Sequence, residues 1–150
     1  MRRIGVTAAT LVLALVSSGC LGSGENLAHK CTATDKRFLA TAAVDLTVLG
    51  IWTADFNAGE ADAEELAQLA FDAAERIGHV QPRDPSLRTA QRYLDAMYTE
   101  YGKAITLKAE GKPAGEHVYR AYGLANFAYD LLLAAQPELE RKGCSVATLL

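Results

Sequence analysis

Three cysteines are the residues of this chain whose type and spacing most directly suggest chemistry. Cys20 follows an apolar run at 4–16 and three small residues, whereas Cys31 and Cys144 lie near opposite ends of the remaining chain. In an oxidising compartment an even set of cysteines favours disulfides. If Cys20 is modified, an even pair remains, and the sequence predicts a Cys31–Cys144 disulfide worth about 5 kcal/mol. Two separate buried thiols are the alternative.

The residues before Cys20 have the layout of a bacterial export signal. Arg2 and Arg3 form a basic start, and the apolar run 4–16 has the length of a signal-peptide core. That run is too short to span a bilayer as a stable helix. The small residues at 17–19 suit a peptidase site, so we expect 1–19 to be a cleaved signal peptide.

The segment Val-Ser-Ser-Gly-Cys at 16–20 resembles the lipobox of bacterial lipoproteins. It departs from that pattern at Ser17, where the family usually has Leu or another aliphatic residue. The resemblance implies lipidation of Cys20 by acyl chains such as palmitate, and a location on the extracytoplasmic face of the cell membrane. Ordinary signal peptidase could instead use the small residues Ser17 and Gly19, and the protein would then be secreted.

Other motifs that carry chemistry do not occur in the sequence. It has no inward Glu-x-x-His pair for a di-iron bundle, no His-Glu-x-x-His zinc motif and no Cys-x-x-Cys-His haem site. The histidines His29, His79 and His117 fall in a lead-in, a loop and a helix start, where we expect them to be solvent-exposed. We therefore expect no catalytic residue, no metal and no cofactor, and predict that the protein is not an enzyme.

Asp45 interrupts the main apolar stripe of the first predicted helix. Either its carboxylate reaches water at the edge of the stripe, or it is buried and satisfied by a hydroxyl or a cation. In the register that the two cysteines would impose, Tyr129 of the last helix lies near the level of Asp45. We therefore predict that Tyr129, or another group of that helix, bonds the carboxylate.

All six tyrosines fall in the last two predicted helices. Tyrosine is enriched where a surface is half apolar and half wet, which includes binding faces. The rings either fill the core and its grooves or form an aromatic binding face made of Tyr98, Tyr101 and Tyr122.

Four segments with helical periodicity, separated by turn residues, must position these side chains. They are 34–57, 60–77, 85–110 and 116–136. Pro137 predicts a kink or the first turn of a new helix, and the apolar residues 145–150 are expected over the end of the bundle. The stripe expected to be buried in the last helix is Val118, Tyr122, Ala125, Tyr129 and Leu132.

The predicted fold is all-α, an antiparallel up-down four-helix bundle closed by one disulfide, after a cleaved signal peptide. Up-down order brings the start of the first helix and the end of the last to one end, where Cys31 and Cys144 must meet. The predicted domains are 1–19, the signal peptide, 20–30, a lipidated flexible tether, and 31–150, the bundle. A membrane span at 38–56 is the alternative for the first helix, but Asp45 makes it costly.

The net charge of the chain argues against one class of function, nucleic-acid binding. Loss of Arg2 and Arg3 with the leader takes the formal net charge from -3 to -5, which disfavours binding to nucleic acid. The sequence favours a membrane-anchored lipoprotein that acts as a non-catalytic module and binds an envelope protein or another envelope component. The alternative is a small-ligand-binding bundle with a pocket between the third and fourth helices.

Overall fold

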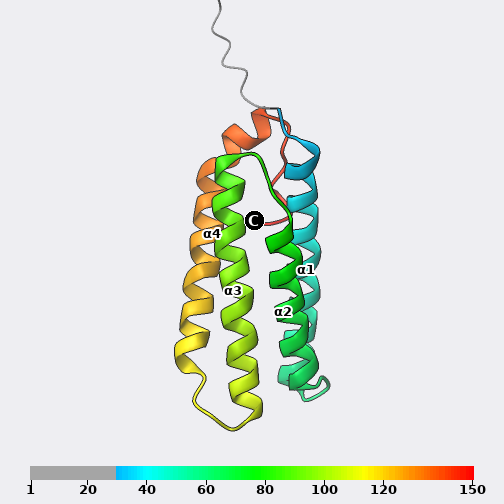
Figure 1. The fold of residues 1–150 in the computed structure, drawn as a ribbon, viewed down its shortest axis with the longest axis vertical. Helices are drawn as coiled ribbons and strands as arrows, with labels where there is room; N and C mark the ends of the chain where they lie inside the picture. Colours follow the sequence, from blue (N-terminus) through cyan, green and yellow to red (C-terminus); the bar gives the residue numbers. More distant parts are fainter. Residues whose placement is uncertain (1–29) are drawn as a thin grey trace, which may run out of the picture.

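The computed structural model describes residues 30–150. Within that range the chain forms four helices and no strand: α1 (Ala33–Ala58), α2 (Ala63–His79), α3 (Pro85–Ala109) and α4 (Gly115–Arg141). Figure 1 shows the helices running side by side with alternating direction. The predicted all-α up-down bundle is confirmed, and the helix bounds differ from the predicted ones by at most a few residues.

Capping side chains decide where α1 and α2 begin. The Thr32 hydroxyl accepts a hydrogen bond from the Asp35 N–H, and the Asp35 carboxylate accepts one from the Thr32 N–H, which is a capping box. Gly59 ends α1 in the left-handed region at φ 79°. The Asp62 carboxylate accepts from two amides in the first turn of α2. This helix therefore begins at Ala63, later than the acidic residues before it suggest.

Proline has opposite roles in α3 and α4. α3 begins at Pro85 directly after its capping residue Asp84, as predicted, because proline lacks only an N–H that the first helical turn does not use. Pro137 lies inside α4, which continues to Arg141 rather than ending near Gln136. Figure 1 shows the last turns of α4 leaning over the end of the bundle, as expected where a proline interrupts the helix ladder.

One side of the bundle is not closed by helix packing. α2 packs on α3, α3 on α4 and α1 mainly on α2, while the α1 and α4 backbones stay more than 8 Å apart from Cα to Cα. The C-terminal segment runs back along this side (Figure 1), with Val146 fully buried. Leu149 lines a cavity of about 270 Å³ together with Leu46 of α1 and Tyr129 of α4. The segment therefore fills part of the gap between α1 and α4 instead of lying over the end.

The face that the fourth helix buries differs from the predicted stripe. Residues such as Phe38, Leu66 and Leu87 of the first three helices are completely buried. In α4 only Leu132 of the predicted stripe is buried, and the helix otherwise buries the following residues: Ala121, Ala128 and Leu139. α1 is long and apolar enough to cross a membrane by length and composition, but here it packs into the bundle.

Candidate functional site

The end of the bundle at which the described chain begins carries the predicted disulfide. Cys31 and Cys144, 113 positions apart, are bonded with their Cα atoms 5.2 Å from one another. The Cys31 N–H also donates to the Lys142 carbonyl at 2.7 Å. The start of α1 is thereby joined to the segment after α4. A disulfide of this kind indicates an oxidising, extracytoplasmic compartment.

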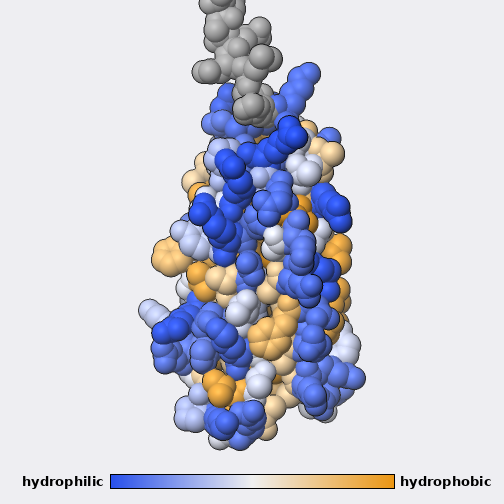
Figure 2. Space-filling model, viewed as in Figure 1, coloured by the Kyte–Doolittle hydropathy of each residue, from blue (hydrophilic) through white to orange (hydrophobic). Residues whose placement is uncertain are grey.

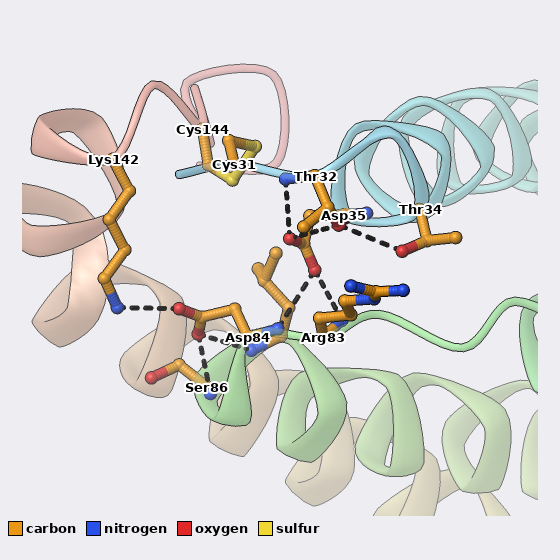
Figure 3. Close-up of a disulfide and its surroundings, with 10 residues drawn as sticks. Cys31, Thr32, Thr34, Asp35, Arg83, Asp84, Ser86, Lys142 and Cys144 are labelled. Carbon is orange, nitrogen blue, oxygen red and sulfur yellow. Dashed lines mark hydrogen bonds and ion pairs between the residues drawn. A yellow bond between two sulfur atoms is a disulfide. The ribbon is translucent and has the colours of Figure 1, made fainter. Parts of the chain in front are cut away.

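Asp35 lies beside the disulfide and is only 2% exposed. One carboxylate oxygen accepts from the Thr32 N–H at 2.9 Å and from the Thr32 hydroxyl at 2.6 Å, as Figure 3 shows. The other accepts from the amides of Arg83 at 2.6 Å and Asp84 at 3.0 Å. Burial alone would raise the pKa of Asp35, but these hydrogen bonds outweigh it and hold the pKa below its usual value.

Asp84 continues this hydrogen-bonded network to α3 and α4. We call the network of Thr32, Asp35, Asp84 and Lys142 the polar joint. One of its oxygens accepts from the Ser86 amide at 2.9 Å and so caps α3, and the other lies 2.8 Å from the Lys142 ammonium. Lys142 also pairs with Glu138 at 2.8 Å. Hydrogen bonds to Asp84 and Glu138 raise the pKa of Lys142. The buried carboxylate of Asp84 is thus paired, which is what a charge in this position requires.

One set of side chains in residues 30–150 has ligand-type atoms close enough to share a metal ion. Cys31, Asp35 and Cys144 place such atoms within 4.8 Å of one another. The two sulfurs are bonded to each other, so neither is the thiolate that a metal needs. The Asp35 carboxylate already accepts four hydrogen bonds. This cluster fits a structural joint better than a metal centre.

Asp45 is buried, and its partner comes from α2. Its Oδ1 accepts from the Arg76 guanidinium at 3.1 and 2.8 Å, and the Asp45 side chain is 4% exposed. The predicted bond to Tyr129 or to another group of α4 is wrong, because the partner of this carboxylate is Arg76 and the α1 and α4 backbones lie more than 8 Å apart. The second oxygen of Asp45 and the Tyr98 hydroxyl have no hydrogen-bond partner among the described residues. Burial, followed by the charge of Asp45, raises the pKa of Tyr98.

The three tyrosines of the predicted binding face do not come together. Tyr98 is completely buried, while Tyr122 is 67% exposed. Tyr101 is half-buried, and its hydroxyl hydrogen-bonds with the Thr53 hydroxyl of α1 at 2.5 Å. Burial raises the pKa of Tyr101, partly offset by that bond. Of the three rings, Tyr122 is the one that a partner can reach over most of its surface.

α4 presents a set of exposed apolar side chains that we call the α4 stripe. Its members are Val118, 53% exposed, Tyr122, 67%, Tyr129, 43%, and Leu133, 47%. Their spacing of four, seven and four residues keeps them on one side of the helix. Because Tyr129 lines the same cavity as Leu46, this side adjoins the gap between α1 and α4. Large apolar side chains exposed along one side of a helix can mark an interaction surface.

Two further surfaces carry exposed apolar groups. Figure 2 shows hydrophobic atoms along the edge formed by α1, where Val44 and Ile51 are more than half exposed. Between α3 and α4 lies a groove of about 610 Å³, whose lining includes Tyr122, Phe127 and Glu100. Hydrogen bonds from Lys103 and then from His117 lower the pKa of Glu100, so this carboxylate is already engaged by its own chain.

Sequence reasoning missed Asp35 and Arg76 as structural groups, and it missed the α4 stripe as a surface. The pattern Thr32-x-x-Asp35 before an apolar run was an available signal for the capping box. Cys20, the predicted lipidation site, lies outside the residues that the structure describes. Comparison of the chain with protein-family models, with curated proteins and with solved structures gives no match.

Proposed function

We propose that this protein is a lipid-anchored, extracytoplasmic module that binds another protein through the α4 stripe and performs no chemistry of its own. The exposure of the stripe is the observation that carries the proposal. Apolar surface left in water forgoes about 25 cal/mol for each Å² that could be buried. A partner that covers these four side chains recovers this free energy, which makes the stripe a favourable docking surface.

The predicted anchor fits such a role. Residues 21–30 separate Cys20 from the bundle, and ten extended residues reach at most about 35 Å. The tether joins the bundle at its disulfide end, and the helices run away from that end (Figure 1). In this arrangement the length of α4 is open to a neighbour on the same membrane face.

The buried carboxylates support the non-catalytic part of the proposal, because each is hydrogen-bonded to groups of the same chain. Asp35 and Asp84 hydrogen-bond to backbone amides, and Asp45 is paired with Arg76. An acid, base or nucleophile must be available to a substrate and positioned with other polar groups around it. These carboxylates instead hold helices together.

Photocrosslinking in intact cells tests the proposed surface. The full chain with its leader would carry a benzophenone amino acid at Tyr129 or, as a matched control, at Ala134, an exposed residue on another side of α4. We expect protein adducts from position 129 and few from position 134. Equal yields, or none at either position, would reject the α4 stripe as the binding surface. Intact mass of the purified chain reports the acyl groups on Cys20, and a retained Met1 would reject the anchor.

A second candidate function is small-ligand binding in the groove between α3 and α4. Its volume of about 610 Å³ lies within the range of ligand sites. The test is titration of the purified protein with an apolar fluorescent probe. If the groove binds ligands, Phe127→Ala weakens probe binding and Val44→Ala, on the distant exposed side of α1, does not.

A further inference from the structure

The α4 stripe has a spacing that is symmetric along the helix. Val118 and Tyr122 are four residues apart, as are Tyr129 and Leu133, and seven residues separate the two pairs. The order of side chains is aliphatic, tyrosine, tyrosine, aliphatic in both directions. A second copy of α4 laid antiparallel on the first therefore places Tyr122 opposite Tyr129, and Val118 opposite Leu133. Self-complementarity of this kind is what a two-fold symmetric interface requires.

The centre of this arrangement is sterically suitable for close approach. The two-fold axis passes between Ala125, which is half-buried, and Asn126, which is exposed. At about 100° per residue these two positions lie on opposite margins of the stripe. The small Ala125 adds little bulk at the centre of the contact, and it also lines the cavity that its own chain forms with Leu46 and Leu149. Asn126 then lies beside Asn126 of the second copy, where the two amides can hydrogen-bond on the outer, wet margin.

Charge does not oppose the pairing. Between the ends of the stripe the charged residues are Arg120 and Asp130, and at about 100° per residue both fall on other sides of α4. Arg120 is already paired with Glu116 on its own helix.

The apolar area that two copies could bury between them is small. A tyrosine ring contributes about 200 Å², so the exposed fractions of Tyr122 and Tyr129 supply about 220 Å². Val118 and Leu133 bring the total to about 400 Å² per copy, and so about 800 Å² per pair, below the ~1,200 Å² of a standard interface. The pair is therefore weak when both copies diffuse freely. In an antiparallel pair the two Cys31 ends lie at opposite ends of α4, whose 27 residues span about 40 Å. Both copies can therefore be anchored in one membrane when the bundles lie along its surface, and shared anchoring then raises the effective concentration.

From these observations we infer that the partner of the α4 stripe is a second copy of this chain, bound antiparallel along α4 on the membrane surface. The inference rests on the proposed function, because it uses the same stripe and the same anchor. It adds the identity of the partner, the register of the contact and the residue at its centre.

Cysteine crosslinking in cells tests the register. The full chain with its own leader would carry Asn126→Cys, or Ala134→Cys as a control on the same helix. After mild oxidation we expect about tenfold more disulfide-linked dimer from position 126 than from position 134, since only the former faces its own copy. Mass analysis checks that Cys31 and Cys144 still pair. Equal dimer yields from the two positions would overturn the inference.

A second comparison separates the stripe from general stickiness. In the Asn126→Cys background, Tyr122→Glu is expected to reduce the dimer about tenfold, because each dimer loses two central aromatic contacts and gains buried charge. Tyr119→Glu is the matched control, since Tyr119 is 79% exposed and lies beside the stripe. It should leave the dimer yield unchanged, and the same loss in both variants would also overturn the inference.

Failure of this inference is distinguishable from failure of the proposed function. If the benzophenone at Tyr129 gives adducts with other proteins but no dimer, the stripe is a binding surface whose partner is not a second copy. If that position gives no adduct at all, both proposals fail.

Discussion

At the scale of single residues, Asp35 shows how one buried carboxylate can join separate parts of the chain. It caps α1 through Thr32 and holds the two amides that lead into α3. Each hydrogen bond to a charged group contributes about 1.5–3 kcal/mol to the free energy of unfolding. The position of α1 relative to the loop before α3 therefore depends on the ionised form of this side chain.

We expect Asp35→Asn to lower the free energy of unfolding by about 3 kcal/mol at neutral pH, because the new amide group faces donors rather than acceptors. The folded-state pKa of Asp35 lies below 3.8, so its contribution is present above that pH and is lost as pH falls through the folded-state pKa. The difference between variant and parent should therefore shrink on acidification. Denaturant titrations at several pH values measure it.

Asp62→Asn provides the control for this prediction. Asp62 also caps a helix, but it is exposed and bonds only to its own first turn, and asparagine caps about as well. The free energy of unfolding of the Asp62→Asn variant should therefore be nearly that of the parent at neutral pH. A similar loss in both variants would contradict the special role of Asp35.

Two tyrosines of α3 make a second residue-scale prediction. The Tyr98 hydroxyl is buried without a partner in the described part of the chain, whereas the Tyr101 hydroxyl bonds to Thr53. We expect Tyr98→Phe to leave stability unchanged or raise it by about 1 kcal/mol, and Tyr101→Phe to lower it by about 1 kcal/mol. Thermal unfolding of both variants decides this, and a large loss in Tyr98→Phe would refute it.

At the scale of elements, α2 and α3 approach closely at Gly102. A Cβ on Gly102 would lie 2.8 Å from the ring of Phe71 on α2, so a glycine here lets this ring cover α3. Gly123 of α4 has nothing within 4 Å of the corresponding position. Both glycines lie inside helices, but only Gly102 is required by a neighbouring side chain.

We expect Gly102→Ala to lower the unfolding free energy by about 1–2 kcal/mol, because the clash outweighs the better helix propensity of alanine. Gly123→Ala should raise it by about 1 kcal/mol, since only propensity changes there. Combining Gly102→Ala with Phe71→Leu should recover most of the loss, and a double-mutant cycle measures that coupling. Purely additive effects would show that the ring is not the obstacle.

At the scale of the whole molecule, the disulfide and the polar joint act on the same end of the bundle. In the described residues α1 packs mainly on α2, and its backbone does not approach that of α4 within 8 Å. Much of its attachment therefore depends on Cys31–Cys144, on Asp35 and on the Asp45–Arg76 pair. A chain assembled in this way needs an oxidising compartment to reach full stability.

We expect the double variant Cys31→Ser/Cys144→Ser to lose about 5 kcal/mol of stability, the value for closing a loop of this length. Hydrogen exchange should show the earliest loss of protection in α1, because the remaining helices pack on one another without it. Reductant should shift the unfolding of the parent to that of the variant and leave the variant unchanged. Uniform loss of protection across all four helices would contradict this account of α1.

Local sequence signals were enough to predict the number of helices, most of their ends and the cysteine pairing. Caps, glycines and prolines act within a few residues of their own position, so these features can be read locally. The shared end of Cys31 and Cys144 followed from the alternating direction of four helices.

Only the tertiary structure decided which face of α4 is buried and which side chain neutralises Asp45. α4 carries apolar residues around most of its circumference, so its periodicity permitted more than one buried face. The C-terminal segment then occupied the side where α1 was expected, and Arg76 of α2 reached Asp45 instead of a group from α4. The buried face of α4 and the partner of Asp45 both depend on how segments distant in the sequence pack. A local sequence pattern therefore cannot predict them.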